Sequence, residues 1–582
     1  MDYSTREMVP GPLPPERGSV GARDVRTTLS DTVNEATADF LRHYRLRVAV
    51  GTGFTDLGWT WRRFQLVMLE PAMVAALRSN NVSTDNRRAW DAPLELDLTA
   101  LWQKKTDPDE EGDHASKDAQ VPPWRAFLRR RSELGRSLLN RIVARLQRRR
   151  FLAGQRSGEP IRGIKKLYFV DAGEIHFTRL GTKPYVYHKY LEGILDFDRM
   201  TIPEDTLVVW YGPIEHLDRK RRDHPRVTFL ESHVEPGCRP LPGLVAQSMW
   251  NAYFHSQSRQ GLLGTLNESE GRRIFGKLLG EDLRFVTGAT RLLERLEGEL
   301  EIVLDSFDST MFSVGQFLLR NYPQHGVVAL QKVLGPYTFS FNMRNQRAIF
   351  EQPSRLLAWS RFHADRLRSH GLTCPIETSC AFKLRTYATW LGQLDHEDIR
   401  RRLGIPAGAR VIMFSAVAEV IGFPLFDRFT YYDMLDQIAQ VATATNSFVL
   451  FKPWPGEDTT VLEAFIHAHF KSSTYRLLPG SAQAFHNAEL LSVTDVLVST
   501  MSSLIGEAFF FGALPVLVNS PSTEAYFSSD YTSEFRRLCA VWERGSSLVE
   551  IVRGLLVMTE EQRVSWRTRA LGMFGFLFGE VQ

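Results

Sequence analysis

The chain has 582 residues, of which 43% are hydrophobic and 24% charged, so it is able to bury the cores of several domains. Its formal net charge of +4 gives no indication of nucleic-acid binding through overall charge. The four cysteines, Cys238, Cys374, Cys380 and Cys539, form no CxxC pair, which argues against a disulfide scaffold or a zinc site and favours a reducing compartment.

The first forty residues are polar and contain four prolines between positions 10 and 15, so we predict a disordered tail over 1–40. They hold no apolar segment, and we therefore expect no signal peptide. The most apolar window, 504–518, contains Glu507 and Pro515 and is too short to cross a bilayer. These features predict a cytoplasmic protein, either free or peripheral on the inner face of the cytoplasmic membrane.

Residues 41–160 form an N-terminal addition, in which 47–50 predicts a strand and 59–77 a helix. The span 125–151 carries ten arginines among apolar residues at helical spacing, which predicts a basic amphipathic helix. One interpretation is that its apolar stripe packs on its own domain. The other is adhesion to anionic lipid headgroups, with each basic residue contributing on the order of 1 kcal/mol. Nucleic acid is not an expected partner, because aromatic residues for base stacking are scarce in this span.

Beyond residue 160, short apolar runs alternate with helical stretches, a pattern typical of an α/β protein with doubly wound parallel sheets. The first series predicts a Rossmann-like domain over 161–385, with strands at 166–170, 207–210, 227–230, 302–304, 327–330 and 356–359. The second series predicts another over 386–582, with strands at 411–414, 448–451, 475–478, 496–498, 514–518 and a candidate sixth at 538–542. Two such domains in tandem leave a cleft between the carboxyl ends of their sheets, where ligands bind.

A hydroxyl-rich turn follows the strand at 496–498. Ser499, Thr500, Ser502 and Ser503 stand there, and 504–511 then predicts a helix that ends at Gly512. Backbone N–H groups and hydroxyls at the positive end of a helix suit a phosphate. The simpler interpretation is a serine N-cap on an ordinary crossover.

Two other strand ends of the second domain also carry polar groups. Ser415 and Glu419 follow the strand at 411–414, and Lys452 follows the strand at 448–451 in a proline-rich turn. A lysine there would be a point cation at the mouth of the cleft, opposite the start of the phosphate-binding helix. A structural ion pair is the alternative.

The segment Lys452-Pro453-Trp454-Pro455-Gly456-Glu457, followed later by Asp495–Val518, resembles the bacterial surface-polysaccharide glycosyltransferases of the GT-B fold. Relatives of that group include CDP-glycerol glycerophosphotransferases and bacterial sialyltransferases. The resemblance implies that Ser502 and Ser503 bind the donor's phosphates, that Glu507 lies near its ribose and that Lys452 neutralises the leaving phosphate. Trp454 stands where the family has histidine, so indole stacking would replace an imidazole contact. The predicted donor-binding set is Ser415, Glu419, Lys452, Trp454, Pro455, Ser499, Thr500, Ser502, Ser503 and Glu507.

If the chain is a transferase, an acceptor hydroxyl must lose its proton, so a carboxylate of the first domain should face the donor's anomeric carbon. Asp171, Glu174, Asp305 and Asp308 all follow predicted strands. We predict Asp308 as the base and Asp305 as the cap of the following helix, although each carboxylate singly also fits an N-cap or a surface position. The helix dipole, the hydroxyls and Lys452 would stabilise the leaving group, so no metal or other cofactor is expected.

The sequence therefore predicts a glycosyltransferase that moves a sugar from a nucleotide-sugar donor to a cell-surface glycan or a lipid-linked acceptor such as a glycolipid. A transferase of polyol phosphate from a CDP-activated donor would use the same phosphate cradle but attack phosphorus instead of carbon. A catalytically degenerate scaffold protein of the same fold is a further interpretation. A sugar-nucleotide epimerase is disfavoured by the missing carboxylate-rich motifs and the large N-terminal addition.

Overall fold

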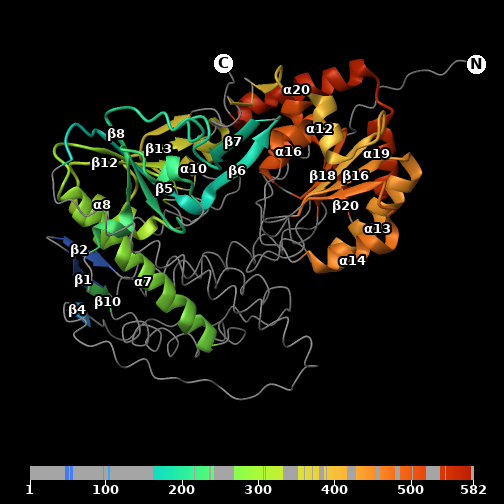
Figure 1. The fold of residues 1–582 in the computed structure, drawn as a ribbon. Helices are drawn as coiled ribbons and strands as arrows, with labels where there is room; N and C mark the ends of the chain where they lie inside the picture. The colour runs from blue at the N-terminus through green and yellow to red at the C-terminus, as the bar shows by residue number, and fades with distance from the viewer. Residues whose placement is uncertain are drawn as a thin grey trace, which may run out of the picture.

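Figure 1 shows the fold in a computed structural model of the chain. The predicted tail over 1–40 and the predicted helices over 59–77 and 125–151 lie outside the described residues. The structure describes residues 46–50, 53–56, 96–97, 102–104, 161–181, 183–214, 217–234, 238–240, 268–305, 307, 310–331, 351–358, 361–369, 371–378, 386–387, 390–415, 428–453, 459–478, 485–500, 502–519, 538–543 and 545–578.

The first domain is built on a seven-stranded parallel sheet with the order β14-β13-β12-β11-β5-β8-β9. Numbered along the chain and read from β9 to β14, the order is 3-2-1-4-5-6-7. The first six strands have the Rossmann order, and the switch point lies between β5 and β11. The strands are β5 (Lys166–Asp171), β8 (Thr206–Tyr211), β9 (Val227–Phe229), β11 (Glu301–Leu304), β12 (Gly326–Leu330), β13 (Arg355–Ala358) and β14 (Ile376–Thr378).

The second domain repeats the plan with a six-stranded parallel sheet, β17-β16-β15-β18-β19-β20, whose chain order is 3-2-1-4-5-6. Its switch point lies between β15 and β18. The strands are β15 (Val411–Ser415), β16 (Phe448–Phe451), β17 (Tyr475–Leu477), β18 (Val496–Ser499), β19 (Leu514–Asn519) and β20 (Ala540–Glu543). Two Rossmann-like sheets in one chain confirm the predicted α/β, GT-B-like fold class.

Helices cover both sheets, which is why their strands read as nearly continuous apolar runs. In β5, Leu167 and Phe169 belong to the core beneath α7 and α8, whereas Val170 belongs to the core on the opposite face. This burial on both faces fixes the register of the strands and aligns their carboxyl ends. The larger helices are α7 (Glu268–Leu293), α8 (Phe312–Asn321), α10 (Arg361–Ser369), α12 (His396–Leu403), α13 (Arg428–Thr445), α14 (Thr460–His469), α16 (Ser503–Phe511) and α19 (Leu548–Leu556).

A hairpin that the sequence reading missed joins the two domains. Strands β6 (Ile175–Leu180) and β7 (Lys183–His188) pair antiparallel directly after the short turn that ends β5. Figure 1 shows the hairpin between the two domains. The Tyr185 ring lies 5.0 Å from Trp390, and the Tyr187 ring lies 4.6 Å from His486. The hairpin therefore belongs to the first sheet's loops but packs on the second domain.

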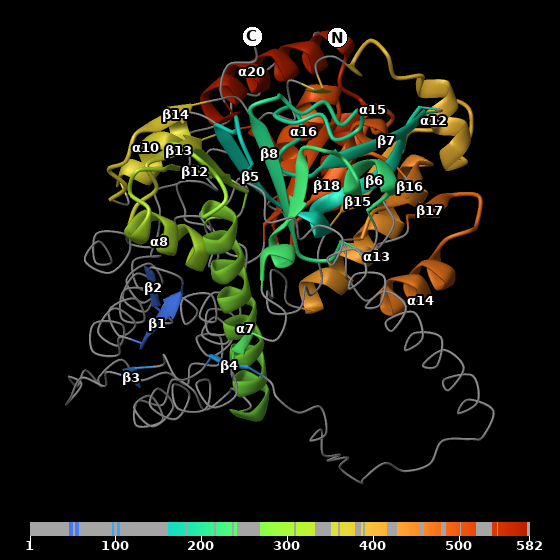
Figure 2. The same ribbon diagram turned by 60° about the vertical axis from the view of Figure 1, so that its left-hand side comes forward.

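The C-terminal helix α20 (Glu560–Phe578) also contacts both domains, through α10 of the first and α16 of the second. Figure 2 shows it lying across the top of the molecule. Arg567 Nη2 donates to the carbonyl of Phe510, 2.8 Å away, near the negative end of α16. This contact places a cation where the α16 dipole favours one.

Part of the N-terminal addition lies against the first domain. Strand β1 (Leu46–Val50) confirms the strand predicted at 47–50 and pairs with β2 (Gly53–Asp56) and β3 (Leu96–Asp97). β2 contacts α8, and β4 (Trp102–Lys104) pairs with β10 (Cys238–Pro240). Within the part of the chain that the structure describes, no helix has both the length and the apolar character needed to cross a membrane.

Candidate functional site

The two switch points carry side chains of opposite chemistry. Ligands of doubly wound sheets bind beyond the carboxyl ends of the strands at the switch point. At β5 and β11 of the first domain these ends carry Asp171 and Asp305, and at β15 and β18 of the second they carry Ser415 and Ser499. We call the first set the acidic edge and the second, with the turn that follows β18, the hydroxyl edge.

At the hydroxyl edge, three neighbouring strands end at the same level. Ser499 pairs with Ser415 and donates through Oγ to its carbonyl at 2.8 Å, and both residues are buried. Lys452 is half-buried and follows Phe451 of β16, so it lies level with Ser415, and its N–H donates to the carbonyl of Phe414. Since neighbouring strands lie about 4.8 Å apart, the Cα atoms of Lys452 and Ser499 are roughly 10 Å apart. The predicted cation and hydroxyl turn thus lie at one edge of one sheet.

The helix α16 begins at this edge. Ser502 is its N-cap, with an extended backbone, and its Oγ accepts from the N–H of Leu504 at 3.2 Å. Gly512 ends the helix at a φ of +83°, a left-handed conformation that favours glycine. The N-terminus of α16 therefore points its remaining N–H groups toward the space beyond β18.

Thr500, between β18 and α16, is the unusual residue of the hydroxyl edge. Its side chain is buried, with 2% of the residue exposed, and Oγ1 has no hydrogen-bond partner among the described residues. A buried polar group without a partner costs about 1–3 kcal/mol. Such a cost is tolerated where a ligand supplies the missing partner, and an anion at the start of α16 would do so.

Glu507 lies in the second turn of α16 and is buried inside the second domain. Its Oε2 accepts from the hydroxyl of Tyr387 at 3.1 Å and from Nδ2 of Asn487 at 3.3 Å. Burial and the Glu507 charge raise the pKa of Tyr387 well above its usual value, so the phenol remains a donor. The ribose contact of Glu507 stays a prediction. Four other members of the predicted donor-binding set, Glu419, Trp454, Pro455 and the side chain of Ser503, lie outside the described residues.

At the acidic edge, Asp305 binds to three elements of the first domain. Its Oδ2 accepts from the N–H of Asp171 at 2.8 Å, and its Oδ1 accepts from the hydroxyl of Tyr211 at 2.5 Å. Nε2 of His188 lies 3.4 Å from Oδ2, and both side chains are almost fully buried. The prediction that Asp305 caps the next helix was wrong: α8 has Met311 as its N-cap, without a side-chain cap bond. Asp308 lies outside the described residues.

Asp171 is held in a cradle formed by two glycines. Its Oδ1 accepts from the N–H of Gly173 at 2.8 Å. A Cβ on Gly212 would lie 2.7 Å from the same oxygen, and Gly212 has a φ of +80°. A larger residue at position 212 would therefore both strain the backbone and displace the carboxylate. Asp171 is half-buried, so this fixed carboxylate remains partly accessible.

Glu174 ends the turn that follows β5 and lies among three polar side chains. Its Oε2 lies 3.7 Å from Nζ of Lys189 and 3.9 Å from Nε2 of His176, and its Oε1 accepts from the Tyr190 hydroxyl at 3.5 Å. Burial, and then the Lys189 charge, lower the pKa of His176 to about 4, with Glu174 opposing them. His176 is therefore neutral at pH 7, and Glu174 is paired with a lysine.

Over the ranges given above, the structure shows no group of three or more His, Cys, Asp or Glu residues placed to hold a metal ion.

No protein-family model matches the chain, and no curated protein matches it. Solved structures with a similar course of the chain include a putative UDP-N-acetylglucosamine 2-epimerase from Listeria monocytogenes, at 12% identity and a TM-score of 0.40, covering 70% of this chain and 91% of that one. The α,α-trehalose 6-phosphate synthase from Burkholderia multivorans has 10% identity and a TM-score of 0.41, covering 71% and 93%. The wall teichoic acid polymerase TagF has 11% identity and a TM-score of 0.40, covering 77% and 94%. At these identities and TM-scores the likeness supports no statement about activity.

Proposed function

We propose that the protein is a transferase that binds the phosphate of a nucleotide-activated donor at the hydroxyl edge. The observation that carries the proposal is the buried hydroxyl of Thr500, which has no hydrogen-bond partner among the described residues and precedes the N-terminus of α16. Lys452 lies at the same edge and adds a cation. Together these groups provide N–H donors, a hydroxyl and a positive charge, which is what a phosphate requires.

In this proposal the bond between the transferred group and the donor phosphate breaks, and a bond forms to an acceptor oxygen. The electron pair of the broken bond goes to the phosphate, where the α16 N-terminus and Lys452 stabilise the added charge. The acceptor's proton goes to a carboxylate of the acidic edge. Of the described carboxylates, Asp171 suits this role best, because it is fixed by Gly173, half-buried and at the switch point. Asp308 remains the other candidate base.

We further propose, from the sequence resemblance at Lys452–Glu457, that the transferred group is a sugar, that the donor is a nucleotide sugar and that the acceptor is a cell-envelope glycan or a lipid-linked glycan. The proposed reaction needs no metal and takes place in the cytoplasm. A CDP-activated polyol phosphate would occupy the same phosphate cradle, so the donor screen below includes CDP compounds.

The test replaces Ser502 by aspartate. Aspartate is as good an N-cap as serine, so Ser502→Asp preserves α16, but its negative charge opposes an anion at the same place. Ser547→Asp makes the same exchange at the N-cap of α19, whose Ser547 Oγ accepts from the N–H of Glu550. Thermal unfolding is then measured with UDP-, GDP-, CMP- and CDP-linked donors for the wild type and both variants.

One donor class should raise the Tm of the wild type and of Ser547→Asp, and should leave Ser502→Asp unchanged. Lys452→Ala should lower the affinity for the same donor about tenfold or more, since a charge-assisted hydrogen bond is lost. The proposal is abandoned if no donor raises the Tm of the wild type, or if Ser502→Asp responds as strongly as the wild type. The first result would favour a scaffold protein.

A further inference from the structure

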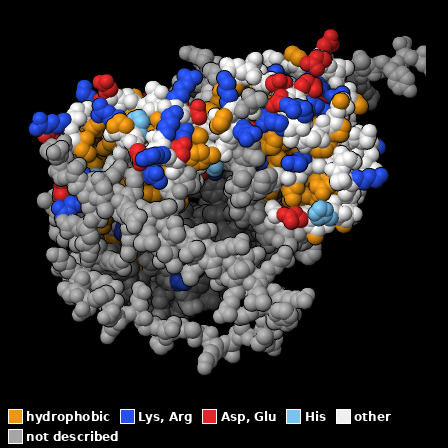
Figure 3. All heavy atoms as spheres, viewed as in Figure 1, with side chains coloured by type: hydrophobic (Ala, Val, Ile, Leu, Met, Phe, Trp, Pro, Cys, Tyr) orange, Lys and Arg blue, Asp and Glu red, His pale blue; other side chains and the backbone are white. Residues whose placement is uncertain are grey.

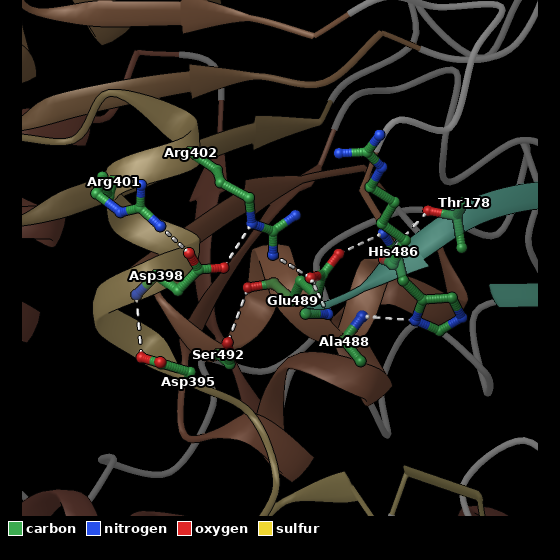
Figure 4. Close-up of polar contacts among 11 residues, drawn as sticks. Thr178, Asp395, Asp398, Arg401, Arg402, His486, Ala488, Glu489 and Ser492 are labelled. Atoms are coloured by element: carbon green, nitrogen blue, oxygen red, sulfur yellow. Dashed lines mark hydrogen bonds and ion pairs between the residues drawn. The ribbon is translucent and has the colours of Figure 1, made fainter. Parts of the chain in front are cut away.

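The tip of the β6–β7 hairpin is bound by a buried carboxylate of the second domain. Glu489 is fully buried, and its Oε1 accepts from the N–H of Gly181 at 2.9 Å. The guanidinium of Arg402, on α12, also contacts Oε1, and Oε2 accepts from the N–H of His486 at 3.2 Å. Figure 4 shows Arg402 and His486 converging on Glu489 from two sides. One carboxylate therefore joins α12, the start of α15 (Asn487–Ser492) and the hairpin.

Glu489 is itself held in place by residues of its own domain. Arg402 donates through Nε to Asp398 at 2.9 Å, and its guanidinium carbon lies 5.1 Å from the centre of the Phe485 ring. These two contacts fix the guanidinium that binds Glu489. Glu489 is also the third residue of the capping box that begins α15 at His486. The acceptor that faces the hairpin is thus fixed by its own domain.

A second set of contacts lies along the hairpin's length. The His486 ring packs at 4.6 Å against Tyr187 of the hairpin and at 5.0 Å against Trp390 of its own domain. Its Nε2 lies 3.5 Å from Oε1 of Glu192, which also accepts from the Tyr185 hydroxyl at 3.1 Å. Glu192 and His486 are both nearly fully buried, so water competes little for these contacts.

We propose that the β6–β7 hairpin is a strap, anchored by Glu489, that holds the second domain against the first before any ligand binds. The hairpin leaves the acidic edge directly after Glu174, so fastening its tip to Glu489 sets where the acidic edge lies relative to the second domain. Without the strap, only the connecting chain and α20, among the described elements, would provide major links between the domains, so the separation of the domains would vary. The proposal concerns the domain arrangement and stands whether or not the chain is a transferase.

Two variants of the full chain test the strap while keeping α15 intact. Glu489→Gln preserves the capping box, since glutamine is accepted at that position, but removes the charge that binds Gly181 and Arg402. His486→Ser preserves the N-cap but removes the ring contacts to the hairpin. Glu301→Gln is the matched control, because Glu301 pairs with Arg355 at 2.6 Å within the first sheet. Hydrogen exchange of peptides covering 175–188 and the radius of gyration from X-ray scattering are measured without ligand.

In Glu489→Gln, exchange at the hairpin tip should rise about tenfold, because the charged acceptor of the Gly181 N–H becomes a neutral amide and the hydrogen bond weakens. His486→Ser should speed exchange along β7 and enlarge the radius of gyration, and Glu301→Gln should change neither quantity. The strap is refuted if both test variants retain the wild-type exchange of the hairpin and the wild-type radius. Should Glu489→Gln also expose β15 and β18, it is unfolded, and His486→Ser alone decides.

Discussion

The acidic edge and the hydroxyl edge occupy equivalent places in two sheets that share the strand order 3-2-1-4-5-6, yet they differ in the hydrogen-bond partners of their buried polar groups. At the acidic edge Asp305 accepts from Asp171 and Tyr211, so the buried carboxylate has its partners within the protein. At the hydroxyl edge, Thr500 has a buried hydroxyl for which the described residues provide no partner. The shared topology fixes where a site can lie, and the residues at the strand ends decide how many of the buried polar groups find hydrogen-bond partners within the protein.

The largest expected effect is on the free energy of unfolding, which should fall more when a polar group is removed at the acidic edge than at the hydroxyl edge. Asp305→Ala removes the acceptor of the part-buried N–H of Asp171 and of the buried Tyr211 hydroxyl, and each unmade bond costs about 1–3 kcal/mol, so the loss should reach about 3–5 kcal/mol. Ser499→Ala removes one neutral bond, to the Ser415 carbonyl, and should cost about 1 kcal/mol. Urea unfolding of both variants measures the difference. Equal losses would contradict the view that the carboxylate is the main structural group at its edge.

A smaller effect is expected from removing the hydroxyl of either of two buried threonines, Thr494 before β18 and Thr500 after it. Thr500→Val removes a hydroxyl that has no partner among the described residues, so it should stabilise the unliganded protein by up to about 1 kcal/mol while weakening donor binding about tenfold. Thr494→Val removes a hydroxyl that donates to the Leu490 carbonyl at 2.7 Å, so it should cost about 1 kcal/mol and leave donor binding unchanged. Urea unfolding and a donor titration give both quantities. Unchanged donor affinity in Thr500→Val would remove the hydroxyl edge as the proposed binding site.

The smallest effect is a pH dependence of stability, to which His176 of β6 contributes. The pKa of His176 is lowered from 6.5 to about 4, so between these values the unfolded chain binds a proton that the folded chain does not. Stability should therefore fall as the pH drops from about 6.5 to about 4, and His176→Asn should reduce that fall. His233, whose pKa burial also lowers to about 4, accounts for a part that remains in the variant. Urea midpoints at pH 7.5 and 4.5 test this, and an identical fall in the wild type and His176→Asn would contradict it.

The sequence was sufficient to predict the central strands of both sheets, because these are apolar runs buried on both faces. β8, for example, is buried at every position, and its pattern needs no knowledge of distant partners. The edge strand β14 was not predicted, because Ile376 is only half-buried and the next two residues are exposed. The hydroxyl edge was also predictable, since Ser499, Thr500 and Ser502 are adjacent in the chain and a buried strand precedes them. Lys452 is distant from them in sequence, but it lies at the same edge because β16, β15 and β18 are neighbours in the sheet.

The hairpin and the role of Asp305 were not predictable because their partners are remote in sequence. β6 and β7 contain exposed and charged residues and Pro184, and part of their apolar contacts, such as that of Tyr185 with Trp390, are made to the other domain. Asp305 precedes a helix, which favours a cap, but its partners lie 134 and 94 positions away at Asp171 and Tyr211. Local pattern cannot distinguish a carboxylate that caps forward from one that reaches back across a sheet.

The contacts of α20 with both domains should keep the domains associated after the chain between them is cut. The polypeptide passes from the first domain to the second after β14 and returns through α20 to lie on α10. A single backbone cut between 378 and 386 would therefore leave the two parts associated, because α20 and the β6–β7 hairpin still contact both domains. We expect the fragments from such a cut to elute together under native conditions, and removal of 560–578 to be required before they separate.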